Sequence, residues 1–107
     1  KLPSLNDELK ENDKAIAISE REWKEIRMLM DTEYDQFTVR LQRVVPELNV
    51  ADLNFCCLLK INVSMHDLAN IYCINKASVS RRKQRLKEKM GDALLHGQTL
   101  DDFLQRF

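Results

Sequence analysis

The side chains best suited to chemistry lie within residues 76–89, where seven residues are basic and only Glu88 is acidic. The whole chain has 17 basic and 17 acidic residues and no net formal charge, so this segment concentrates positive charge. Guanidinium and carboxamide groups form paired hydrogen bonds with the edges of guanine and adenine in the major groove of DNA. Arg81 and Gln84 are therefore candidate base-reading residues, and the short hydroxyl of Ser80 lies beside them in the sequence.

A helix over residues 77–90 would place an apolar stripe on its inner side and these three side chains on its outer side. Other basic and hydroxyl groups fall at the margins of the outer side, where phosphate oxygens are within reach. These candidate phosphate ligands are Lys76, Ser78, Arg82, Lys83, Arg85 and Lys87. Arg82 and Lys83 flank the apolar stripe, so we expect their stems to pack against the protein and their heads to reach solvent or phosphate.

The rest of the chain has the periodicity of helices. Apolar residues recur at spacings of three and four, and no segment shows the sustained alternation of a strand. The 107 residues include only two glycines and two prolines, which are residues that favour tight turns. The expected fold class is all-α. The longest apolar run, residues 55–59, is far shorter than a membrane span of about 20 residues, so we expect a soluble domain. Three cysteines without a CxxC pair favour a reducing compartment, so we expect this domain in the cytoplasm.

Helix starts are indicated by cap residues followed three positions later by an acidic residue, a pattern that satisfies amides of the first helical turn. Such pairs are Ser19 with Glu22, Asn49 with Asp52, Ser64 with Asp67, and Thr99 with Asp102. Asp31 or Thr32 is expected to cap a further helix that ends before Pro46. Its apolar residues would be Tyr34, Phe37, Leu41, Val44 and Val45. Gly91 suits the C-terminal cap of the basic helix.

The cysteines and histidines are not expected to form a functional site. Cys56, Cys57 and Cys73 contain no CxxC pair, and two of them are adjacent, which is unsuitable for a disulfide framework. Together with His66 and His96 they show no zinc-site spacing. We therefore predict core packing for the cysteines and neither a metal site nor a cofactor. His66 is expected to be an exposed residue of a first helical turn.

The order of elements between residues 49 and 90 describes a helix-turn-helix unit, with a long apolar helix, a short helix, a turn of three or four residues and the basic helix. Residues 53–59 are apolar around most of a helical circumference and are expected at the centre of the core. The chain divides at residue 47. We expect residues 1–47 to form an N-terminal helical extension with an arm over 1–18 and a helical pair over 19–45, and residues 48–107 to form the helix-turn-helix domain with a C-terminal helix.

Residues 48–91 resemble the helix-turn-helix domain of LuxR/NarL-type bacterial transcription regulators. The resemblance is carried by Leu48, Asn49 and Asp52, by Ser64, Asp67, Leu68 and Ala69, by Ile74, Asn75, Ser78 and Val79, and by Leu86, Lys89, Met90 and Gly91. It implies a three- or four-helix bundle of the winged-helix-superfamily type with a preceding helical pair. It also implies sequence-specific binding of double-stranded DNA, transcription regulation in signal transduction, and base contacts at the positions of Ser80, Arg81 and Gln84.

The stretch that contains Trp23, Phe37, Leu41 and Pro46 resembles a subgroup in which this domain ends a longer regulator. The resemblance implies an upstream sensor region and a full-length protein that could be anchored in a membrane, and the start at Lys1 rather than at a methionine agrees with this expectation. The candidate partners are double-stranded DNA, a second copy of the chain as a homodimer, and RNA polymerase. No small-molecule substrate is expected for this part of the protein.

Two other functions remain open. Residues 78–87 also resemble the promoter-reading helix-turn-helix of a sigma-like factor. In the other alternative the apolar segments 23–30 and 100–107 dock a protein partner, and the basic helix only keeps the domain in solution. An enzyme is not expected, because the sequence shows no nucleophile paired with a base, no ligand cluster and no phosphate-binding glycine loop.

Overall fold

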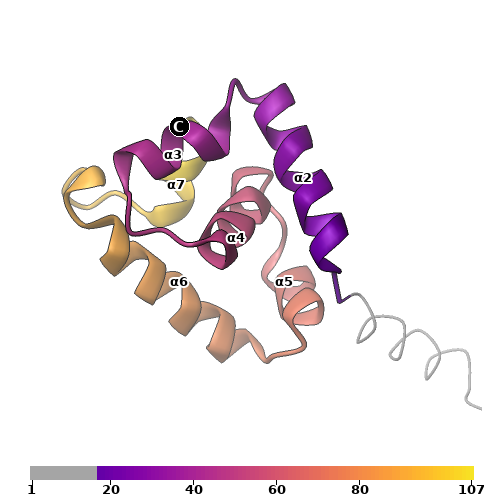
Figure 1. Ribbon diagram of the computed structural model, residues 1–107. Helices are drawn as coiled ribbons and strands as arrows, with labels where there is room; N and C mark the ends of the chain where they lie inside the picture. Colours follow the sequence, from indigo (N-terminus) through magenta and orange to yellow (C-terminus); the bar gives the residue numbers. More distant parts are fainter. Residues whose placement is uncertain (1–16) are drawn as a thin grey trace, which may run out of the picture.

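The computed structural model describes residues 17–107, which form six α-helices and one short 3-10 helix without a strand (Figure 1). The elements are α2 (Glu20–Glu33), α3 (Phe37–Val44), α4 (Val50–Lys60), α5 (Met65–Tyr72), α6 (Lys76–Met90), η1 (Gly91–Ala93) and α7 (Leu100–Arg106). The all-α prediction is confirmed for this part of the chain, in which no helix is both long and apolar enough to cross a membrane. Most of the expected N-terminal arm, residues 1–16, lies outside the described residues.

Five of these six α-helices begin at a residue whose side chain accepts a hydrogen bond from a backbone N–H of the first turn. The Ser19 hydroxyl accepts a hydrogen bond from the Glu22 N–H, and the Glu22 carboxylate accepts one from the Ser19 N–H. Asn49 and Asp52 exchange the same two bonds at α4. The predicted caps at Ser64, Thr99 and Gly91 are also confirmed. These bonds satisfy amides that have no partner inside their own helix, which is why short sequence patterns locate the helix starts.

The start of α3 differs from the prediction, because α2 runs through Asp31 and Thr32 to Glu33. Gln36, in the left-handed region, holds the N-cap position of α3, so neither predicted residue caps this helix. Asp31, which belongs to α2, nevertheless accepts hydrogen bonds from the first turn of α3. Its Oδ1 accepts hydrogen bonds from the Thr38 N–H at 2.7 Å and from the Thr38 hydroxyl at 2.8 Å.

The apolar face of α3 is consequently narrower than predicted. Phe37, Leu41 and Val45 are buried, as expected. Tyr34 instead lies in the turn before the helix, and Val44 on its outer side is 52% exposed. The helix ends before Pro46, as predicted.

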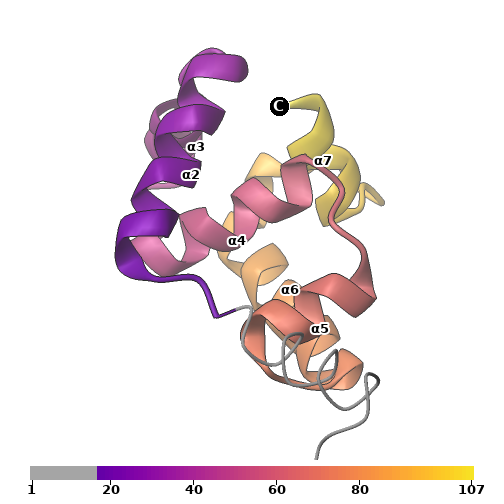
Figure 2. The ribbon, with the colours of Figure 1, turned by 90° about the vertical axis from the view of Figure 1, so that its right-hand side faces the viewer.

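α4 lies at the centre of the bundle, with the other helices arranged around it (Figures 1 and 2). All residues from 53 to 59 are buried, which confirms the predicted central helix. α2, α3 and α7 pack on α4, and one core cluster joins Trp23 of α2 to Leu104 of α7. Leu100 and Leu104 are buried, so the C-terminal helix folds back on the chain's own core.

The cysteines divide between the core and the surface. Cys56 and Cys57 are buried in α4, as predicted, and burial raises the pKa of the Cys57 thiol to about 12. For Cys73 the prediction of core packing is wrong, because this residue is exposed. Cys73 ends α5 with a left-handed φ of 54°, where the chain leaves the helix on the way to α6.

Candidate nucleic-acid interface

α5 and α6 are joined by a turn of three residues, 73–75. The backbone N–H of Cys73 donates to carbonyls in the last turn of α5 and closes that helix. Asn75 opens α6, because its Oδ1 accepts a hydrogen bond from the Ser78 N–H at 2.8 Å. The two helices pack directly against each other. The predicted order of short helix, tight turn and basic helix is therefore present in the structure.

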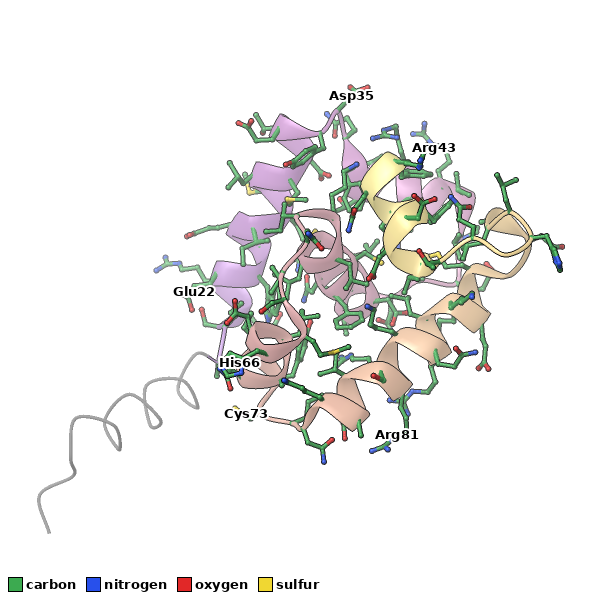
Figure 3. All side chains as sticks on the ribbon, turned by 180° about the vertical axis from the view of Figure 1, so that it is seen from behind. Glu22, Asp35, Arg43, His66, Cys73 and Arg81 are labelled. Carbon is green, nitrogen blue, oxygen red and sulfur yellow. The ribbon has the colours of Figure 1, made fainter. Side chains whose placement is uncertain are left out.

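α6 is buried along one side only. Val79 is 0% exposed, and Leu86 and Met90 are each 3% exposed. On the opposite side Ser80, Arg81 and Gln84 are all exposed; they are the three candidate base-reading residues. α6 lies at the rim of the bundle (Figure 1), and the labelled Arg81 points away from the ribbon (Figure 3). The predicted outward orientation is confirmed, whereas contacts with DNA stay a prediction.

The side chains of Arg81 and Ser78 are linked within α6. Nη2 of Arg81 donates a hydrogen bond to the Ser78 hydroxyl at 2.9 Å. The bond joins residues three positions apart, which face each other on a helix. One nitrogen of Arg81 is thus engaged at the flank of α6, while the rest of the guanidinium remains on the exposed side.

The candidate phosphate ligands fall into two groups. Lys76, Arg85 and Lys87 are exposed and form no ion pair within residues 17–107. Ser78 is half-buried, and its hydroxyl accepts from Arg81. The other two, Arg82 and Lys83, are also half-buried. The first group is therefore the part of the predicted set that is free to meet a phosphate.

The heads of Arg82 and Lys83 contact the protein itself. Cζ of Arg82 lies 4.3 Å from the ring centroid of Tyr72 and 5.4 Å from that of Phe55. Nζ of Lys83 lies 2.8 Å from Oδ2 of Asp101 in α7. Both side chains are half-buried and both heads contact the protein, whereas contact with a phosphate stays a prediction. Nothing local in the sequence indicates these partners, because they lie on other helices.

Grooves run along both sides of α6. The groove toward α7 is lined by residues that include Ser80, Gln84, Lys87, Thr99 and Asp101. The groove toward α4 is lined by residues that include Asn49, Asp52, Arg82, Arg85 and Lys89, and Lys89 forms an ion pair with Asp52 there. α6 therefore stands out as a ridge between two grooves.

No group of three or more His, Cys, Asp or Glu side chains in residues 17–107 could hold a metal ion. His66 is exposed in the first turn of α5, as predicted, and its Nε2 lies 3.2 Å from the Asn70 amide nitrogen. What the surface does offer is hydrogen-bond donors and positive charge along α6.

Comparison of the chain with protein-family models, with curated proteins and with solved structures finds no match. The geometry and charge of α6 therefore carry the functional conclusion.

Proposed function

We propose that this chain is a transcription regulator that binds double-stranded DNA sequence-specifically, with α6 in the major groove. The observation that carries the proposal is the exposed outer side of α6, from which Arg81 and Gln84 project. Arginine pairs with guanine and glutamine with adenine through two hydrogen bonds each, and these contacts distinguish base pairs in the major groove. Ser80, which can donate or accept, lies beside them.

The dimensions and charge of α6 suit this groove. A helix with its side chains is about 10–12 Å across, and the major groove is about 12 Å wide. The exposed cations Lys76, Arg85 and Lys87 surround the base-reading side chains and are placed to contact phosphates, which supply affinity without sequence preference. The resemblance of residues 48–91 to LuxR/NarL-type domains, in which base contacts fall at the same positions, supports the proposal.

The structure bears differently on the two alternatives. Of the apolar segments, Trp23, Met30 and Leu104 are buried in the chain's own core, whereas Met28 and Leu29 are exposed, so a protein-docking surface there would have to use the latter two side chains. A sigma-like factor would use α6 in the same way as a regulator. The requirement for core RNA polymerase separates these two roles, because a regulator of the proposed kind binds its site without polymerase.

The direct test is selection of duplexes from a random pool with the protein as bait, followed by a titration of the winning duplex at several salt concentrations. Each phosphate contact contributes about −0.9 to the slope of log K against log salt, so three contacts per chain predict a slope of about −2.7. Half-sites spaced by about one DNA turn would indicate a dimer. An unenriched pool, or binding that does not depend on salt, would contradict the proposal.

A further inference from the structure

Four helices contribute one side chain each to a continuous aromatic and cationic array beside α6. The Tyr72 ring of α5 lies against the Trp23 ring of α2 in a stacked arrangement, with 6.1 Å between centroids and 26° between planes. The same Tyr72 ring meets Phe55 of α4 edge to face at 5.6 Å. Arg82 of α6 completes the array with its guanidinium 4.3 Å from the Tyr72 centroid.

Tyr72 acts in this array through its ring. Its hydroxyl oxygen is buried and has no hydrogen-bond partner among the described residues. Burial raises the pKa of the Tyr72 phenol to about 12, with the nearby Arg82 opposing the change, so the ring stays neutral at ordinary pH. A guanidinium over a neutral aromatic face is attracted by the ring's quadrupole, and the attraction is stronger where water is excluded.

Arg82 contacts the core beside the inner stripe of α6. The buried side chains Val79 and Leu86 are seven residues apart on the inner stripe, and Arg82 lies between them on the flank toward α4 and α5. On the opposite flank Lys83 pairs with Asp101 of α7. The two flanking contacts hold α6 from both sides and oppose rotation about its axis. A rotation would move Arg81, the next residue, by the same angle.

We propose that Arg82 is a positioning residue for DNA recognition rather than a phosphate ligand, and that its guanidinium over Tyr72 and Phe55 holds α6 in the orientation that presents Arg81 and Gln84 to the bases. This inference rests on the proposed function. It separates Arg82 from the neighbouring Arg85, which is exposed and keeps the role of a phosphate ligand.

The first test compares Arg82→Lys with Arg82→Met on two duplexes, one selected by the wild-type protein and one with the same composition in scrambled order. Lysine keeps the charge but not the planar group that lies flat on a ring. We expect both variants to lose about tenfold in the ratio of selected to scrambled affinity, a loss that lies between those of an exposed and a desolvated cation–π contact. The affinity of Arg82→Lys for the scrambled duplex and its salt slope should stay unchanged.

Arg85→Lys and Arg85→Met are the matched controls on the same helix. A phosphate ligand reads no bases, so Arg85→Lys should change the affinity for both duplexes by the same factor and leave the selected-to-scrambled ratio at the wild-type value. Arg85→Met should weaken both duplexes alike and reduce the salt slope by about 0.9. If the Arg82 variants instead change the affinity for both duplexes alike, and Arg82→Met also reduces the salt slope by about 0.9, Arg82 is a phosphate ligand and the inference is wrong.

Substitutions of Tyr72 remove the aromatic ring from the same contact with Arg82. Tyr72→Leu should lower the selected-to-scrambled ratio as Arg82→Lys does, whereas Tyr72→Phe should leave it unchanged because the hydroxyl that it removes has no partner among the described residues. Trp23 is the only tryptophan of the chain and stacks on Tyr72, so its fluorescence reports whether the array persists in each folded variant. Normal discrimination by a folded Tyr72→Leu protein would overturn the inference.

The outcomes also separate this inference from the proposed function. If the wild-type protein does not discriminate between the two duplexes, the proposed function fails and the role of Arg82 in recognition fails with it. If the wild-type protein discriminates but Arg82→Lys does so equally well, only the positioning role is refuted.

Discussion

The guanidinium of Arg81 donates from Nη2 to the hydroxyl of Ser78 at 2.9 Å, one helical turn toward the N-terminus of α6. Both side chains belong to the predicted interface, but the structure connects them to each other. The bond restricts an otherwise flexible arginine before any partner arrives, and a side chain ordered in advance loses less entropy on binding. Ser78 thereby acquires a role through Arg81 that differs from its predicted contact with phosphate.

Replacement of Arg81 by alanine should relax base choice at one position of the selected site, at a cost of about 1–3 kcal/mol. Ser78→Ala should cost less on the selected duplex, and its effect should disappear when Arg81 is already alanine, because the hydroxyl would act through that residue. A double-mutant cycle of binding affinities measures this coupling. Additive losses from the two substitutions would show that Ser78 contacts DNA independently of Arg81.

Lys76→Ala should weaken all duplex sequences to a similar extent, because an exposed cation at the edge of α6 supplies affinity without reading bases. The magnitude of the salt slope should fall by about 0.9, since the substitution removes one phosphate ligand. Titrations of the selected and scrambled duplexes over a range of salt concentrations check both expectations. Weaker binding of the selected duplex alone would instead make Lys76 a base-reading residue.

Asn75→Ala should destabilise the protein by about 0.5–2 kcal/mol, because it removes the cap that accepts from the Ser78 N–H at the start of α6. For a domain of this size each kcal/mol lowers the Tm by about 4–8 °C. Glu88→Ala is a suitable control, since Glu88 is exposed on the same helix and should change stability by less than about 0.5 kcal/mol. Equal Tm values for the two variants would argue against the cap.

Leu104→Ala should cost about 2–5 kcal/mol in the free energy of unfolding, because this α7 side chain is 0% exposed in the core. Leu95→Ala, at a side chain that is 74% exposed, should change the value by less than about 0.5 kcal/mol. Urea unfolding measures both. A small effect of Leu104→Ala that depends on protein concentration would indicate that α7 packs against a second copy instead.

Stability should decline as the pH rises into the alkaline range. Burial raises the pKa of Tyr72 from 10.0 to about 12 and that of Cys57 from 9.0 to about 12. The folded state therefore holds these protons more tightly than the unfolded state, so the free energy of unfolding falls as the pH rises from about 9 to 12, and the contribution is fully present below that range. Urea midpoints across this range should fall less for Tyr72→Phe, and identical slopes for the two proteins would contradict the burial of the phenol.

Features that depend on neighbours in the sequence could be predicted. A capping pair such as Asn49 and Asp52 is a bond between residues three positions apart, and its geometry belongs to the helix start itself. The outward direction of Arg81 and Gln84 follows from the rotation of about 100° per helical residue once the inner stripe is known. Both kinds of feature require only local backbone geometry, which the residue types specify.

Contacts between residues that are distant in the sequence could not be predicted, because they depend on how the helices pack in the folded chain. A guanidinium at the flank of a helix can meet solvent, a phosphate or an aromatic ring, and for Arg82 the choice depends on the packing that brings Tyr72 and Phe55 beside it. The start of α3 was missed for a similar reason, since Asp31 bonds to Thr38 across a turn rather than capping its own segment. The sequence determines which groups α6 carries, whereas long-range packing decides which of them contact the protein itself and which remain exposed.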